Sequence, residues 1–222
     1  MRHANRIATV CLLLLFLFVL KSHSSQGAKS ASPDPLTQQV NNYIDTGDDF
    51  RIMVAHLTQK YGIPAGMDLE NPSKRDFISV HISHGTVAEV LNAIVAQKPG
   101  YKWTEMDSVV NIMPQSQRDS ILDVRIADFH IANANFFEIH AAIVSLPEVK
   151  RWLEQNHFTE ATSFAGIVPV GPNGLGLARV SLDLHDVTLR EILNKTIKSP
   201  GFSSWIIGRW GEKNQYLSIS VH

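Results

Sequence analysis

An internal repeat sets the strongest limit on the fold of this 222-residue chain. Residues 78–97 align with residues 180–199 at an offset of 102. The apolar positions match in type, and five aligned pairs are identical: Ser79/Ser181, Thr86/Thr188, Glu89/Glu191, Leu91/Leu193 and Asn92/Asn194. A Pro-Gly pair follows each copy, at Pro99-Gly100 and Pro200-Gly201. Self-similarity at a fixed offset is typical of a duplicated folding unit. We therefore expect the two halves to share one fold.

Each copy predicts a strand, a capped helix and a hairpin. Apolar residues alternate with polar ones over 78–83 and 180–185, which is the period of a half-buried strand. Thr86 and Glu89 then form a Thr-x-x-Glu capping box, repeated at Thr188 and Glu191, so a helix begins at each. Short strands follow the Pro-Gly pairs, over 101–105 and 109–113 in the first copy and over 202–210 and 216–221 in the second.

The flanking segments predict two small α+β domains of βαββαββ type. A helix over 50–61 and a short strand over 67–70 precede the first copy. A strand over 121–131 and a helix over 135–156, bent or broken at Pro147, precede the second. We place the first domain at 37–114 and the second, divergent domain at 121–222, with an insert at 157–178. Residues 28–36 form a flexible leader and residues 115–120 a linker.

Residues 1–27 read as a secretory signal peptide. Arg2 and Arg6 precede an apolar run of 14 residues, Ile7 to Leu20, and a polar tail ends in small residues before Ala28. The alternative is a retained membrane anchor, but about 20 apolar residues are needed to cross a bilayer. We expect an exported, periplasmic or secreted protein with no membrane span once the signal is cleaved.

Cleavage changes the composition of the mature chain. Three basic residues and no acidic one are lost, leaving 17 Lys+Arg against 21 Asp+Glu, and Cys11 is the only cysteine. The mature protein would therefore lack thiolate catalysis and thiolate metal sites. Its negative charge also argues against a general nucleic-acid binder, because such a protein needs a basic surface.

The order of elements resembles a known family. A helix over 50–62, a strand over 78–82, the capped helix that begins Thr86-Val87-Ala88-Glu89-Val90-Leu91 and a hairpin over 101–113 are similar to the short N-terminal module shared by secretins and TonB-dependent transducers. Residues 180–221 repeat the last three parts. The resemblance implies a periplasmic protein–protein contact domain without catalytic residues. Because no barrel, plug or secretin ring follows residue 222, we expect a free-standing adaptor.

Candidate chemical motifs are weak. His81 and His84 are three residues apart on a predicted strand, so they face opposite sides and favour surface histidines over a metal site. His130, His140 and His185 are scattered singly. The glycine-rich segment 171–176 lacks the Gly-Lys-Ser/Thr ending of a phosphate loop, so we expect a mobile surface loop. We assign no catalytic, cofactor-binding or metal-ligating residue.

Two further classes of function stay open. A hydrolase acting on cell-wall glycan would need paired carboxylates, for which the candidates are Asp123, Asp128, Glu138 and Glu154. A carbohydrate-binding protein would need exposed tryptophans among Trp103, Trp152, Trp205 and Trp210, of which Trp210 is expected to be the most exposed.

The favoured hypothesis is a non-enzymatic module that binds a protein partner in the cell envelope, in adaptor, signalling or assembly work. An exposed sheet edge or hairpin would accept a strand of the partner. The strand over 216–221 is the candidate edge.

Overall fold

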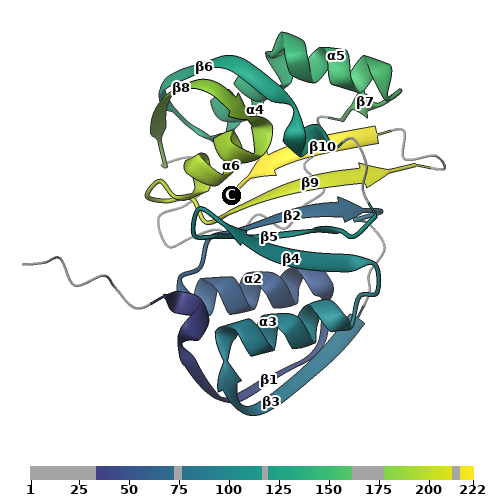
Figure 1. The fold of residues 1–222 in the computed structure, drawn as a ribbon, viewed down its shortest axis with the longest axis vertical. Coiled ribbons are helices and arrows are strands. Elements are labelled where there is room, and N and C mark those ends of the chain that lie inside the picture. Colours follow the sequence, from purple (N-terminus) through teal and green to yellow (C-terminus); the bar gives the residue numbers. More distant parts are fainter. Residues whose placement is uncertain (1–33, 73–76, 117–119, 162–177, 212–215) are drawn as a thin grey trace, which may run out of the picture. The chain divides into compact units, whose positions relative to one another are not determined.

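The computed structural model confirms the α+β class predicted for the chain (Figure 1). It describes residues 34–72, 77–116, 120–161, 178–211 and 216–222. The predicted signal peptide at 1–27 lies outside these residues, with Cys11 and most of the leader at 28–36. Most of the insert at 157–178 and its glycine-rich segment also lie outside them.

The first half begins with a short 3₁₀ turn at Pro35–Thr37. It continues as β1 (Gln39–Asp49), α2 (Phe50–Tyr61), β2 (Ala65–Glu70), β3 (Phe77–Thr86), α3 (Val87–Ala96), β4 (Tyr101–Met106) and β5 (Val109–Pro114). The predicted capping box starts α3: the Glu89 amide donates to Thr86 Oγ1 at 3.2 Å, and the Thr86 amide donates to Glu89 Oε2 at 2.6 Å. The helix start predicted from Thr86 is therefore confirmed.

The second half follows the same order after a 3₁₀ turn at Ile121–Asp123. Its elements are β6 (Arg125–Ala134), α4 (Phe136–Ser145), α5 (Pro147–Gln155), β7 (Thr159–Glu160), β8 (Val180–Thr188), α6 (Leu189–Ile197), β9 (Ser204–Trp210) and β10 (Tyr216–Val221). The capping box of Thr188 and Glu191 is present, and backbone donation from Thr188 lowers the pKa of Glu191. The predicted helix break at Pro147 is confirmed, because α5 begins there.

Two local predictions were wrong or incomplete. Strand β1 was not predicted, because its asparagines, aspartates and glycine are typical of turns. Pairing with β3 over nine residue pairs nevertheless makes it a strand. Residues 121–123 were predicted to begin a strand, but Ser120 caps a 3₁₀ turn there and the strand starts at Arg125. Tertiary pairing decides the first case, and a local side-chain cap decides the second.

One six-stranded sheet contains strands of both halves, in the order β4-β5-β2-β9-β10-β7. β2 runs parallel to β5 on one side and to β9 on the other. The ribbons β1–β3 and β6–β8 are separate antiparallel pairs. The expectation that residues 216–221 form the sheet edge is corrected in part: β10 lies between β9 and β7, but β7 pairs only with Tyr216 and Leu217, whereas β4 is an outer strand of the described sheet.

Each half keeps its own hydrophobic core within the compact unit formed by residues 34–222. The first core holds Phe50, Met53 and Leu91, and the second holds Ile139 and Leu193. Helices α2 and α3 lie on one face of the central sheet and α4 and α6 on the other (Figure 1). The reversed strand directions explain this, because β9 and β10 run opposite to β4 and β5 at equivalent positions.

Candidate functional site

The junction between the halves is a parallel strand pair with a tryptophan at its centre. β2 and β9 pair from Ala65↔Ser204 to Glu70↔Arg209, and Gly66 stands opposite Trp205. The Trp205 side chain is fully buried. A Cβ atom placed on Gly66 would lie 1.8 Å from Cε2 of that indole, so no other residue type fits without moving the ring. We call this pairing the β2–β9 junction.

Polar side chains fix the β2–β9 junction. Trp205 Nε1 donates to Asn194 Oδ1 at 2.8 Å, and Asn194 on α6 is itself buried. The Arg209 guanidinium donates to the Asp68 carboxylate, and both side chains are almost completely shielded from water. A buried ion pair of this kind must be satisfied, because an unpaired charge in the interior is costly. The junction therefore depends on specific partners as well as on apolar packing.

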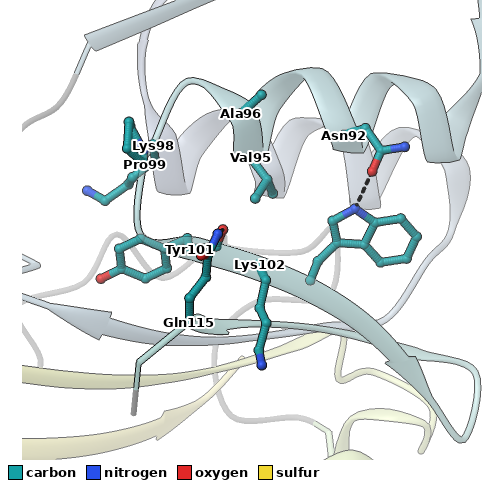
Figure 2. Close-up of a pocket in the computed structure, with 9 residues that line it drawn as sticks. Asn92, Val95, Ala96, Lys98, Pro99, Tyr101, Lys102 and Gln115 are labelled. Carbon is teal, nitrogen blue, oxygen red and sulfur yellow. Dashed lines mark hydrogen bonds between the residues drawn. The ribbon is translucent and has the colours of Figure 1, made fainter.

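The first half carries the same tryptophan–asparagine pair on β4. Trp103 Nε1 donates to Asn92 Oδ1 at 2.8 Å, as Figure 2 shows. Both residues align with Trp205 and Asn194 at the offset of 102. In contrast to the second half, Trp103 is half-buried and Asn92 is exposed. The tryptophan–asparagine hydrogen bond is thus repeated in both halves, but only the pair in the second half is buried.

Strand β4 pairs on one side only within the described residues. All six residues of β4 pair with β5, from Tyr101↔Pro114 to Met106↔Val109. Residues 102 and 104–106 of β4 are exposed, and Met106 retains 42% of its surface. A strand paired on one side presents free backbone N–H and C=O groups on the other. We call this side of β4, with Trp103 and Asn92, the open edge.

A pocket of about 410 Å³ lies beside the open edge, between the end of α3 and the start of β4 (Figure 2). Its lining is Asn92, Val95, Ala96, Lys98, Pro99, Tyr101, Lys102, Trp103 and Gln115. Burial raises the pKa of the Tyr101 phenol above its usual value. These nine residues include no carboxylate, histidine or cysteine.

The histidines that the sequence singled out do not meet. His81 and His84 are both exposed on β3, and His84 Nδ1 lies 3.0 Å from Asn41 Oδ1. His185 lies 2.6 Å from Asp128, a hydrogen bond that raises the pKa of His185, and His130 lies 3.4 Å from Asp183. His140 Nε2 lies 3.4 Å from Glu160. His130 and His185 also share Asp183 as a neighbour on the exposed face of the β6–β8 ribbon, whereas His140 is largely buried.

One cluster of possible metal ligands was missed by the sequence reasoning. Side-chain oxygens of Asp45 and Asp48 and a ring nitrogen of His56 lie within 4.8 Å of one another. A hydrogen bond with Asp45 raises the pKa of Asp48. The cluster joins a strand to a helix 11 residues further on, a separation that matches no metal-binding motif. An acidic surface cluster is by itself no evidence for an ion.

The candidate carboxylates of a hydrolase have other partners. Asp123 accepts from Arg190 at 2.8 Å, Asp128 from His185, and Glu138 closes the cap of α4 by accepting from the Asn135 amide. Glu154 is exposed on α5. Three of the four candidates thus have a structural role.

The tryptophans occupy unlike surroundings. Trp152 stacks on Phe158 with ring centroids 5.4 Å apart, and Trp210 stacks on Tyr216 at 6.3 Å. Both are half-buried, like Trp103, so Trp210 does not stand out as the most exposed.

Comparison with known families and curated proteins identifies no relative of this chain. No protein family model matches the chain, and no curated protein matches it. Among the described residues, no helix combines the length and the apolar character required to cross a membrane.

Proposed function

We propose that this chain is an exported, non-enzymatic module of the cell envelope that binds another protein along the open edge of β4. The observation that carries the proposal is the unequal covering of two equivalent strands. β9 carries a Trp–Asn pair and is paired with β2 on the side away from β10. β4 carries the same Trp–Asn pair but, in the described part of the chain, is paired with β5 alone.

Physical chemistry supports this use of the open edge. A partner strand would satisfy the free backbone groups of β4 and gain main-chain hydrogen bonds, while adjacent pockets select its side chains. The pocket between α3 and β4 lies in the right place for such selection. The resemblance to the secretin and TonB-associated module, which makes protein contacts, points to the same class of function. The family assignment remains part of the proposal.

An in-cell cross-linking experiment tests the proposal. A photoreactive amino acid replaces Lys102, which is exposed on β4, and in a matched control it replaces Lys150, which is exposed on α5. We expect a discrete cross-linked product from position 102 that position 150 does not give. Equal products at both positions, or none at either, would contradict protein binding along β4.

Export is tested separately. We expect the chain to be recovered in the periplasmic fraction with residues 1–27 removed, because their charge and apolar length are those of a signal peptide. Amino-terminal sequencing of the recovered protein locates the cleaved bond. A full-length chain that stays with the inner membrane would show that this segment is a retained anchor.

A further inference from the structure

The geometry points to the kind of strand that the open edge accepts. We propose that the partner presents an extended segment parallel to β4, with a glycine opposite Trp103 and a lysine or arginine two residues after it. This inference rests on the proposed function. It adds the direction, register and two side-chain requirements of the partner.

The direction and register follow from the β2–β9 junction. β9 and β4 occupy equivalent places, since each follows a Thr-capped helix and carries a tryptophan 11 residues after the asparagine that it contacts. β2 lies parallel to β9 with Gly66 opposite Trp205. A segment that adds to β4 in the same manner runs parallel to it and places one residue opposite Trp103.

The glycine requirement follows from the position of the indole. Asn92 and Asn194 hold Trp103 and Trp205 by the same hydrogen bond at the same length, so both rings cover the neighbouring strand position. At Gly66 a Cβ atom would meet the ring carbons at 1.8 and 2.0 Å. The residue opposite Trp103 must likewise lack a side chain, or the indole must break its hydrogen bond to Asn92.

The basic residue follows from a change of charge between the halves. In the β2–β9 junction Asp68, two residues after Gly66, pairs with Arg209. At the offset of 102 the first half has Glu105 where the second has Ile207, the residue opposite Asp68, and it has Asp107, in the turn that follows β4, where the second has Arg209 on β9. Both acidic residues are exposed. The side chain at this position of a partner therefore meets negative charge, which favours lysine or arginine.

A different protein fits the open edge better than a second copy of this chain. The glycine-containing strand β2 is already paired on both sides, with β5 and β9. At the far end of the sheet, β7 comprises only Thr159–Glu160 in the described part of the chain. Charged residues at 102 and 105 also oppose pairing of one open edge with another.

The test uses a peptide probe on the purified protein. The probe is the chain's own segment 63–70 carrying Asp68→Lys, and the readout is the indole N–H resonance of Trp103 in a ¹⁵N spectrum, identified by its loss in Trp103→Phe. We expect a saturable shift of that resonance. A second peptide that also carries Gly66→Val should bind at least about tenfold more weakly. The segment with its native Asp68 should bind about threefold more weakly, the size of an exposed charge effect.

The outcomes separate this inference from the proposed function. Equal binding of the glycine and valine peptides, or an unmoved Trp103 resonance, would overturn the inference while cross-linking at Lys102 still supports protein binding. Concentration-dependent dimerisation that occupies β4, seen by sedimentation together with a shift of the Trp103 resonance, would overturn the choice of a different protein as the occupant. A Trp103 shift with the predicted order of affinities supports the inference directly.

Discussion

Strands β9 and β4 begin with the same local arrangement and differ in what lies beside them. On β9 the indole of Trp205 is buried and packs over Gly66 of β2, and the next two residues are Ile206 and Ile207. On β4 the indole of Trp103 is half-buried, and Thr104 and Glu105 follow it, both exposed. The duplicated motif thus tolerates two surroundings, because the asparagine contact is local while the covering strand is not. The polar residues of β4 are those expected of a strand that faces water on one side.

The largest effect is expected from closing the space under Trp205. Gly66→Val should lower the free energy of unfolding by about 4 kcal/mol or more, because the new side chain overlaps the buried indole. Chemical denaturation measures the change. Thr104→Val, which adds the same side chain to the open edge, is the control and should change stability by less than about 0.5 kcal/mol. Similar losses of stability in both variants would contradict the difference in packing between the β2–β9 junction and the open edge.

Removing the buried charge pair should have the next largest effect. Asp68→Leu leaves Arg209 charged in the interior and should cost about 3–4 kcal/mol of unfolding free energy. Adding Arg209→Met should restore much of that loss, since no charge then stays unpaired. The exposed pair of Arg125 and Asp186 provides the control: Asp186→Asn should cost less than about 1 kcal/mol. A double variant as unstable as Asp68→Leu alone would contradict a role for the unpaired charge.

Acid should weaken the contacts at the start of β9 more than those at the start of β4. The His222 backbone exchanges hydrogen bonds with Ser204 at the start of β9, whereas Gln115, which does not titrate, holds the start of β4 through Tyr101 and Gly100. Burial lowers the pKa of His222 to about 4. Between pH 6.5 and 4 the unfolded chain therefore binds a proton that the folded chain does not, and stability falls as the pH falls.

The size of this effect is about 3 kcal/mol at most, the free energy of a shift from 6.5 to about 4. Unfolding midpoints measured from pH 7 to pH 4 should fall less steeply in His222→Gln than in the native chain. The contribution of His222 should level off below pH 4. Identical slopes would show that His222 does not titrate in this window.

The smallest changes in unfolding free energy are expected when each of the two tryptophans is replaced by phenylalanine. Trp205→Phe leaves the buried Asn194 amide without its donor and should cost about 2 kcal/mol. Trp103→Phe should cost less than about 1 kcal/mol, because water can replace the lost contact of the exposed Asn92. Thermal unfolding of both variants makes the comparison. A larger loss for Trp103→Phe would mean that the open edge contributes more to folding than its exposure suggests.

Much of the fold was predictable where local chemistry dominates. The Thr-x-x-Glu boxes at Thr86 and Thr188 marked two helix starts, because a side chain reaches only its own first turn. Pro147 marked the break between α4 and α5 for the same local reason. β1 was not predicted, because its turn-forming residues become a strand only through pairing with β3. The candidate edge at 216–221 was only partly right, because the two-residue strand β7, which the sequence pattern did not indicate, pairs with Tyr216 and Leu217.

The sequence by itself determined the duplicated unit, its helix caps and the repeated asparagine and tryptophan, since these depend on residues close together in the chain. Only the tertiary structure decided that β2 would pair with β9, that Gly66 would lie beneath Trp205 and that, within the described residues, β4 would pair on one side only. The physical reason is that residues 66 and 205 are far apart in the sequence. Their contact depends on strand pairing and on the shape of the indole, and no local sequence pattern indicates either of these. The same residue types therefore form a buried junction in one half and, within the described residues, an exposed strand in the other.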